Sequence, residues 1–588
     1  MKEHTVERPH LYPNLEDWPI YKLHAERDAF VRALERESLD ELLRAQSDLV
    51  DLLQAVIYAE KSRVKKDPWK VDPPNELAWW RRTERKLVRA GLDGDAPAQR
   101  EARRELLRRI VRRYAEEVVG SFKIPTFQFA RKFLTQFFGR LLSAAEPKDL
   151  GIRGSVKAKL RRRLIVSGQV ERTRRLLVDH HVVILPTHFS NLDSLLIGYA
   201  LDGFAGIPHS TFGAGLNLLN SGWVAYFINR FGAYRVDRRK RNPVYLEVLK
   251  SFSRLAIARG VNSTFFPGGT RNRAGQIERE LKLGLLGTCV EAQREMLQAG
   301  SDRKVVVVPL VLSYHFVLEA KFLIQEHLRR TGREQYLGKP SQQFGYRTLI
   351  KFLWQLFRTS SEIHLSLGQP LDVLGNPVDD EGVSLGPGGR PIDVADYFCR
   401  AGDVVRDDQR ERVYTRMLGD AVVDRFHRDH VVLTSHVVAY VAFRILRQFH
   451  PDLDLYGVLR LNEEEFKIER DLMLRTIATV TQRLEQLEAQ GRVRLSAVVR
   501  DAPDEVLRDG VHHMSLYHDG APLRIEGDGL VSEDYHLLYY YYNRLTGYPL
   551  EAASTLEIEG DVRGIRTARV AMLPDGEEEQ EEGVASME

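Results

Sequence analysis

The stretch Val182-Val-Ile-Leu-Pro-Thr-His188-Phe-Ser-Asn-Leu-Asp193 joins a short β-branched run to a polar turn. An apolar run of this length and composition is typical of a buried strand. Ser190 or Asn191 then offers an N-cap for a helix that begins directly after the strand. His188 is therefore expected at the C-terminal end of a strand, where open α/β sheets bind their ligands.

Similar apolar runs follow this stretch, and helical patterns separate them. The further expected strands are 263–266, 305–308 and 362–367, and the helices between them include 243–259 and 281–299. Strands that alternate with helices predict an α/β domain with a central, mostly parallel sheet flanked by helices. We place this domain at residues 168–375.

Helical patterns dominate on both sides of this domain. Residues 1–167 are predicted to form a mainly helical N-terminal region, and residues 393–574 a mainly helical C-terminal region. Turn-forming residues at 376–392 predict a loop or linker. The acidic residues 575–588 predict a disordered tail.

The composition of the 588 residues is that of a globular protein, with 43% hydrophobic and 29% charged residues and a net charge of +4. Cys289 and Cys399 are the only cysteines, which excludes a disulfide framework and a cysteine metal site and indicates a reducing compartment. The sequence has no uninterrupted apolar run of membrane-spanning length, and its first residues lack a secretory signal. We expect neither a transmembrane helix nor a metal centre.

His188 and Asp193 form the candidate catalytic pair. One helical turn separates them, so the carboxylate can fold back to the imidazole, fix its tautomer and support its positive charge. A His and an Asp at this spacing are expected about once by chance in such a chain. A structural histidine that pairs with a helix-capping aspartate is therefore the alternative explanation.

Two loops that contain glycine and arginine follow apparent strands. The first is Gly232-Ala-Tyr-Arg-Val-Asp-Arg238, and the second is Pro267-Gly-Gly-Thr-Arg271-Asn-Arg273, with Lys282 nine residues beyond. Glycines allow the backbone to approach a ligand closely, and arginines bind phosphate oxygens bidentately. The loops therefore predict a phosphorylated acceptor. A fourth segment, Val308-Pro309, predicts a strand with a proline at an edge or bulge.

In this order the four segments resemble the blocks of the glycerolipid acyltransferase superfamily. Those blocks are an HxxxxD, a GxxxxDR-like block, a PEGTR or EGGR block and a V-P-V block. The chain is more narrowly similar to the large glycerol-3-phosphate and dihydroxyacetone-phosphate acyltransferases. That similarity is carried by Ala214–Asn217, Arg271–Gly275, Tyr314–Glu319 and Leu537–Asn543.

The resemblance implies an acyltransferase with an α/β fold, in which His188 is the general base and Asp193 orients it. The phosphate-binding residues would be Arg238, Arg271, Arg273 and Lys282. The residues that support these loops would be Gly232, Pro267, Gly268, Gly269, Thr270 and Pro309. The donor would be acyl-CoA or acyl-carrier protein, and the sn-1 hydroxyl of glycerol 3-phosphate would attack it directly to give lysophosphatidate. Neither a cofactor nor a metal is implied.

The sequence departs from the family pattern at Gly268, where the third block usually has a glutamate. That glutamate would lie among the basic residues and help to position them. Its absence leaves Arg271 freer for phosphate, alters the choice of acceptor or weakens activity.

Three other functions stay open. A lysophospholipid (1-acylglycerol-3-phosphate) or dihydroxyacetone phosphate is an alternative acceptor, and a basic helical nucleic-acid-binding or scaffold protein is the non-enzymatic alternative. The leading hypothesis requires no nucleic acid. It predicts peripheral or monotopic attachment to the cytoplasmic face of a membrane that contains anionic lipid, with the bacterial inner membrane as the expected one. The basic stretch 99–113 suits phosphate-bearing partners, and 127–142 and 194–229 are the expected lipid contacts.

Overall fold

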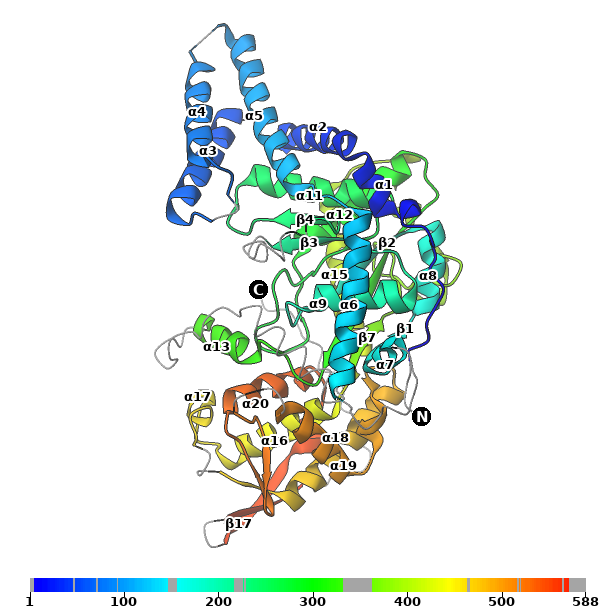
Figure 1. The fold of residues 1–588 in the computed structure, drawn as a ribbon, viewed down its shortest axis with the longest axis vertical. Coiled ribbons are helices and arrows are strands. Elements are labelled where there is room, and N and C mark those ends of the chain that lie inside the picture. Colours follow the sequence, from blue (N-terminus) through cyan, green and yellow to red (C-terminus); the bar gives the residue numbers. More distant parts are fainter. Residues whose placement is uncertain are drawn as a thin grey trace.

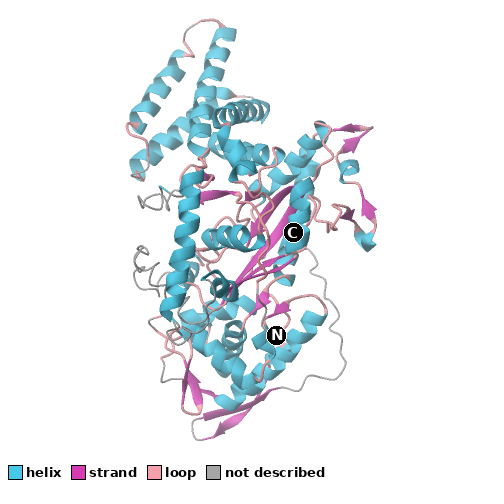
Figure 2. Ribbon diagram, turned by 45° about the vertical axis from the view of Figure 1, so that its right-hand side comes forward, coloured by secondary structure: helices cyan, strands magenta, loops and turns pink. Residues whose placement is uncertain are grey.

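The structure, a computed structural model, is shown in Figures 1 and 2. It describes residues 5–570 except for 46–47, 70–71, 93, 146–155, 216–225, 227–228, 332–361, 463–465, 516–517, 519 and 563–564. The acidic stretch 575–588 and residue Asn217 of the quoted similarity lie outside the described residues.

A seven-stranded sheet forms the centre of the molecule. Its strands are β1 (Leu164–Gly168), β2 (His181–Pro186), β3 (Thr211–Gly215), β4 (Ala233–Val236), β5 (Ser263–Thr264), β6 (Val305–Tyr314) and β7 (Ile363–Leu367). The strand order is β1-β7-β6-β2-β5-β3-β4, and every neighbouring pair is parallel except β6 and β7. The predicted α/β class with a mostly parallel sheet is confirmed.

Strand β2 lies near the middle of this sheet and is buried along its whole length. It pairs with β6 on one side and β5 on the other, in parallel on both. Parallel strands end at the same edge of a sheet, so the segments that follow β2 and β5 emerge side by side. These segments contain His188 and the loop 266–282.

Helices cover both faces of the sheet (Figure 2). They are α8 (Val170–Asp179), α9 (Asp193–Ala200), α11 (Pro243–Ala258) and α12 (Leu283–Gln298), with a π-helical turn at Leu201–Ala205. Helix α13 (Ala320–Arg330) instead packs against the C-terminal helix α20 (Tyr535–Tyr542). The expected helix start was wrong: Leu192 precedes the first residue of α9, and Ser190 and Asn191 do not cap it. Instead, Ser190 Oγ accepts a hydrogen bond from the amide of Leu192, inside the turn.

Pro309 lies in the central strand β6, opposite Leu185 of β2, and not at an edge. It is nevertheless placed where the pairing of β6 is irregular. The β7 ladder ends at Leu310, and the chain beyond β7 then bridges back to Val307. A proline has no amide hydrogen to donate, so this interruption tolerates it.

The N-terminal region is helical. It comprises α1 (Pro19–Ala25), α2 (Arg27–Ala45), α3 (Leu49–Lys66), α4 (Glu76–Arg89), α5 (Ala96–Val118), α6 (Ile124–Ala145) and α7 (Val156–Arg163). A separate apolar core joins α2 and α5 to α11, with Phe30 against Phe252 and Tyr114 against Tyr245. Helices α3, α4 and α5 project from the sheet as an arm at the top of Figure 1.

The C-terminal region is built around the buried helix α16. Its helices are α15 (Asp408–Arg428), α16 (Thr434–Phe449), α17 (Leu455–Val458), α18 (Arg470–Ala489), α19 (Pro503–Ser515) and α20 (Tyr535–Tyr542). Short strands accompany them: β8 (Ser384–Leu385), β9 (Pro391–Ile392), β10 (Cys399–Arg400), β11 (Asp403–Val404), β12 (Val431–Val432), β13 (Ile468–Glu469), β14 (Arg494–Leu495), β15 (Arg524–Glu526), β16 (Gly529–Val531), β17 (Leu556–Val562) and β18 (Ile565–Val570). One apolar core runs from the sheet into this region, so α20 is held firmly against the sheet's ligand-binding edge.

Candidate active site

His188 and Asp193 meet in the turn between β2 and α9. His188 Nδ1 lies 2.9 Å from Asp193 Oδ2. The His188 side chain is 12% exposed, and the Asp193 side chain is fully buried. An imidazole that donates from Nδ1 to a carboxylate keeps the lone pair of Nε2 for a substrate. The pair therefore has the arrangement of a histidine base with an orienting acid.

Asp193 also fixes the turn that carries His188. Its Oδ2 accepts hydrogen bonds from the amides of Phe189 and Ser190, at 2.7 and 2.9 Å. The hydroxyl of Tyr314, at the end of β6, donates to Oδ1 at 2.6 Å. Four donors therefore satisfy one buried carboxylate, as a buried charge requires.

The loop 266–282 holds His188 from the other side. The amide of His188 donates to Glu278 Oε1 at 3.0 Å, and the amide of Asn272 donates to the carbonyl of His188 at 2.7 Å. The His188 ring stacks on Phe266, with centroids 4.0 Å apart. Burial raises the pKa of Glu278 to about 7, against the pull of Arg544 and the donated amide.

Glu319 connects the His188 turn to the arginine loop. Its carboxylate accepts from Ser190 Oγ at 2.9 Å and from the amide of Asn191 at 3.1 Å. Arg271 donates to the same carboxylate at 3.1 Å. Arg271 is thus anchored by an acidic partner, although Gly268 has replaced the glutamate expected beside it.

Arg238, Arg271 and Arg273 come together from the two predicted loops. Arg238 reaches solvent, yet enough protein surrounds its guanidinium to lower its pKa, and the neighbouring charges of Arg271 and Arg273 lower it further. Arg273 pairs with Glu326 at 3.0 Å, whereas Arg238 pairs with no carboxylate among the described residues. Like charges gathered in this way favour an anionic ligand between them.

Among the predicted supporting residues, Gly269 lies in contact with the side chain of Lys282. Gly269 has a φ of +73°, and the side chain of Lys282 lies across it, only 2.6 Å from where a Cβ would be. The amide of Lys282 also donates to the carbonyl of Pro267, and Thr270 Oγ1 accepts from Arg273. Lys282 is thereby held over the second loop.

Gly232 does not lie in this cluster. It has a φ of +76°, and a Cβ there would come within 2.2 Å of Ile20 in α1. Its carbonyl accepts from Thr211 of β3. Gly232 therefore serves the packing of α1 against β4 and β3.

The segment around α20 closes the far side of the second loop. Asn543 donates to the carbonyl of Ala274 at 2.8 Å, and a Cβ on Gly275 would lie 2.1 Å from the carbonyl oxygen of Tyr540. The guanidinium of Arg544 covers the ring of Phe189 at 3.5 Å. Sequence reasoning missed Arg544, Glu278 and the anchoring role of Glu319.

A narrow, largely apolar recess lies behind Phe266, the residue on which His188 stacks. It runs between α9 and the ends of β3 and β5. Its lining residues are Ser194, Ile197, Gly198, Leu201, Pro208, His209, Ser210, Phe212, Thr264 and Phe266. Its volume is about 20 Å³, so in this conformation it has room for no more than one water-sized group.

Away from this site, His315, Asp509 and His513 form one group of metal-ligating side chains in the described part of the chain, with ligand atoms within 4.8 Å. The two imidazole rings are stacked, with centroids 4.2 Å and planes 21° apart. Imidazole lone pairs lie in the ring plane, so stacked rings do not converge on one ion. His513 Nδ1 instead lies 3.0 Å from the carbonyl oxygen of Asp509.

Residues 164–313 match the family model described as Acyltransferase. Several curated relatives carry the name Glycerol-3-phosphate acyltransferase. The protein of Aeromonas hydrophila is 28% identical over 44% of this chain and 28% of its own length. The proteins of Pseudomonas aeruginosa and Haemophilus ducreyi are 24% and 29% identical, over 48% and 34% of this chain and 30% and 23% of their own lengths. The chain thus spans less than a third of these relatives. The predicted family resemblance is confirmed.

Proposed function

We propose that this chain, like the glycerol-3-phosphate acyltransferases that it resembles, moves a fatty acyl group from a thioester to the sn-1 hydroxyl of glycerol 3-phosphate. The observation that carries this proposal is the convergence of the His188–Asp193 pair with Arg238, Arg271 and Arg273. A base and a phosphate site beside each other are what an acceptor with a reacting hydroxyl and a phosphate requires.

In the proposed reaction, His188 Nε2 removes the proton of the hydroxyl as its oxygen attacks the thioester carbonyl carbon. The carbon–sulfur bond breaks, and the thiolate leaves with a proton returned from the imidazolium. Asp193 stabilises that imidazolium, because its carboxylate lies 2.9 Å from Nδ1. No covalent acyl-enzyme is needed, since a thiolate leaves without strong assistance.

The acceptor and the donor occupy different parts of the site in this proposal. Arg238 and Lys282, which have no carboxylate partner within the described residues, bind the phosphate together with Arg271 and Arg273. In this proposal the recess behind Phe266 widens to admit the acyl chain, and the thioester carbon then lies beside the His188 ring. The donor is acyl-CoA or acyl-carrier protein.

Thiol release tests this proposal. Purified protein is given palmitoyl-CoA with glycerol 3-phosphate, dihydroxyacetone phosphate or lysophosphatidate, and the product is identified by mass spectrometry. We expect the fastest release with glycerol 3-phosphate and its loss in His188→Ala. The matched control is His450→Ala, at the end of α16. Release that is absent with all three acceptors, or that is unchanged in His188→Ala, contradicts the proposal.

We also propose that the protein attaches to the cytoplasmic face of a membrane through anionic lipid. Within the described residues, no helix is both long enough and apolar enough to cross a bilayer. The expected contact 194–229 contributes mainly to the core up to residue 215, with Leu196, Ile197 and Phe204 buried. Residues 216–225 and 227–228 lie outside the described residues.

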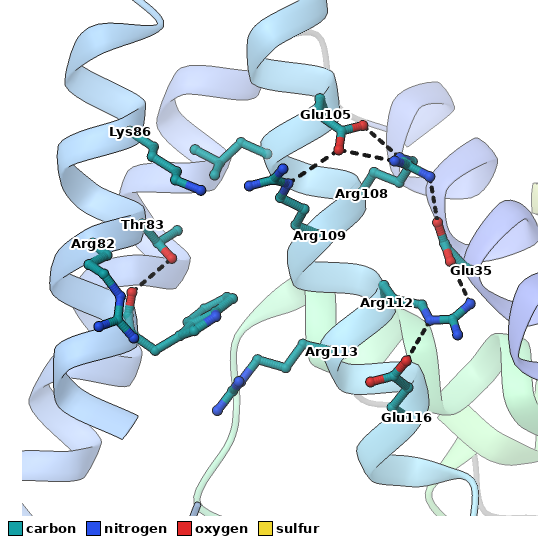
Figure 3. A pocket seen from close by; sticks show the side chains of 12 residues that line it. Glu35, Arg82, Thr83, Lys86, Glu105, Arg108, Arg109, Arg112, Arg113 and Glu116 are labelled. Carbon is teal, nitrogen blue, oxygen red and sulfur yellow. Dashed lines mark hydrogen bonds and ion pairs between the residues drawn. The ribbon is translucent and has the colours of Figure 1, made fainter. Parts of the chain in front are cut away.

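The basic arm offers a better contact for anionic headgroups. Helices α4 and α5 carry twelve Lys and Arg residues against six Glu, a net charge of +6, whereas the whole chain carries +4. A cleft of about 560 Å³ opens between them. Figure 3 shows basic side chains directed into it from both helices, among them Arg82, Lys86, Arg109 and Arg113.

Part of this charge is neutralised by carboxylates of the arm and of α2. Glu105 pairs with Arg108 and Arg109, and Arg112 pairs with Glu35 and Glu116. Arg82 and Lys86 have no such partner in the part of the chain that the structure describes. Val88 and Leu92 are exposed at the end of α4, by 58% and 75%. Free cations beside exposed apolar side chains suit an anionic membrane surface.

Vesicle flotation tests this surface. The protein should float with vesicles that contain phosphatidylglycerol but not with pure phosphatidylcholine, and Arg82→Glu/Lys86→Glu should reduce its flotation severalfold. The control pair is Arg412→Glu/Arg416→Glu, on the exposed side of α15. Equal flotation of both double variants would point to another contact, such as the exposed Phe129 and Phe133 of α6.

A further inference from the structure

The backbone of His188 depends on one buried side chain. Glu278 Oε1 accepts the hydrogen bond of the His188 amide at 3.0 Å. Two residues earlier the strand β2 has ended at Pro186, and α9 begins only at Asp193. The His188 amide therefore has no partner in regular secondary structure, and its position is set by whatever accepts this bond.

Among the described residues, the His188 amide is the one hydrogen-bond donor that reaches Glu278 from elsewhere in the chain. The residue is 7% exposed. Its second oxygen, Oε2, is buried without a hydrogen-bond partner among the described residues. Arg544 lies near enough to favour the charged form of Glu278, but no hydrogen bond between the two residues is found in the described part of the chain. Burying a carboxyl group costs free energy, and the contact that accounts for this burial is the hydrogen bond to His188.

Gly268 leaves the space that Glu278 occupies. A Cβ on residue 268 would lie 3.3 Å from Glu278 Cγ and 3.5 Å from Glu278 Oε1. A longer side chain at 268 would therefore project into the volume that the Glu278 carboxylate now fills. Position 268 is also where the resemblance leads one to expect a glutamate.

We propose that Glu278 is the positioning residue for His188 and that its carboxylate, ten residues further along the chain, occupies the space that a side chain at position 268 would enter. Gly268 belongs to the same arrangement, because a Cβ at this position would already press on Glu278 and a longer side chain would displace its carboxylate. The proposal rests on the proposed function, since it assigns a positioning role in that reaction.

Transplanting the carboxylate tests this proposal. Glu278→Ala removes the acceptor of the His188 amide, so kcat should fall about tenfold to hundredfold while KM for glycerol 3-phosphate changes less than about threefold. Adding Gly268→Glu to Glu278→Ala should recover most of the lost kcat. Gly268→Glu alone should lower kcat, because two carboxyl groups then compete for one space. Glu280→Ala, on the exposed side of the same loop, is the control and should match the wild type.

Hydrogen–deuterium exchange gives a readout that does not depend on activity. The peptide that contains the His188 amide should exchange faster in Glu278→Ala and regain protection in the double variant. Should Glu278→Ala fail to fold, Glu278→Leu keeps the volume and still removes the acceptor. If the His188 amide of the wild type is protected from exchange but the protein has no acyltransferase activity, the proposed function alone is contradicted. Wild-type kcat and exchange in Glu278→Ala, or a double variant no better than Glu278→Ala, would overturn the role of Glu278.

Discussion

Replacing Asp193 with asparagine separates the charge of this residue from its shape. The amide oxygen can take the position of Oδ2 and still accept from His188 Nδ1 and from the amides of Phe189 and Ser190. The amide nitrogen then faces Tyr314, whose hydroxyl can rotate and accept instead of donate. The turn should keep its conformation, so the loss that is measured should be electrostatic.

The size of that loss follows from the geometry. An imidazolium and a carboxylate in hydrogen-bond contact, with charge centres about 4 Å apart, attract each other by about 4 kcal/mol at an effective dielectric constant of about 20. Because the positive charge forms on His188 only as the hydroxyl proton is taken, this attraction acts mainly on the transition state. At about 1.4 kcal/mol per factor of ten, kcat should fall about 100- to 1000-fold in Asp193→Asn.

Thiol release at saturating glycerol 3-phosphate measures this loss, and thermal unfolding checks that the variant is folded. The control is Asp372→Asn, a buried aspartate whose carboxylate accepts from the amides of Leu374 and Asn376 beyond the other end of β6. It should retain the wild-type kcat. A folded Asp193→Asn variant with kcat within about threefold of the wild type would refute the role given to the charge of Asp193.

The remaining predictions concern the groups around this pair. Tyr314→Phe removes one of the four donors to Asp193 and should lower kcat about tenfold with little change in KM, and unchanged kcat would show that the other three donors suffice. Arg238→Ala should lower kcat/KM for glycerol 3-phosphate about tenfold to hundredfold, whereas the exposed neighbour Arg241→Ala should not; equal effects would remove Arg238 from the phosphate site. Gly198→Val should narrow the apolar recess, because a Cβ at position 198 would already lie 3.1 Å from the ring of His209. The variant should shift the acyl-donor preference from palmitoyl-CoA towards decanoyl-CoA. An unchanged donor preference would place the acyl chain elsewhere. The raised pKa of Glu278 means that the folded state holds the proton of this carboxyl group more tightly than the unfolded state does. The protonated carboxyl group therefore stabilises the fold below pH 4.5. This stabilisation, about 3 kcal/mol, is lost as the pH rises to about 7. Denaturant unfolding should therefore show Glu278→Gln gaining stability relative to the wild type between pH 4.5 and pH 7, and a constant difference would contradict the raised pKa.

Local sequence patterns predicted the part of the fold that local physics determines. The strand at 182–185 appears as β2, and the helices expected at 243–259 and 281–299 appear as α11 and α12 with nearly the same bounds. Each has a continuous apolar run or a regular apolar spacing that does not depend on distant residues. The contact between His188 and Asp193 was also predictable, because five residues around a strand end leave little conformational freedom.

Features that depend on distant residues could not be predicted in this way. β1 lay inside a stretch that read as helical, and it is a strand because it pairs with β7 about 200 residues later. Glu278 and Glu319 carry no local signal for the contacts they make with His188 and Arg271. Gly232 was predicted to be part of a ligand-binding loop, but its lack of a side chain instead makes room for Ile20 of α1. Contacts between residues that are far apart in the sequence determine these features, and a single sequence does not reveal such contacts.

The measurement that tests the central claim most directly is the fate of the acceptor oxygen. Glycerol 3-phosphate labelled with oxygen-18 at its sn-1 hydroxyl is incubated with palmitoyl-CoA and the purified protein, and lysophosphatidate is analysed by mass spectrometry. If the His188–Asp193 pair activates that hydroxyl for direct attack, the label remains in the ester and label incorporation falls at least about a hundredfold in His188→Ala. Failure to form labelled lysophosphatidate, or equal formation in His188→Ala, would contradict the account.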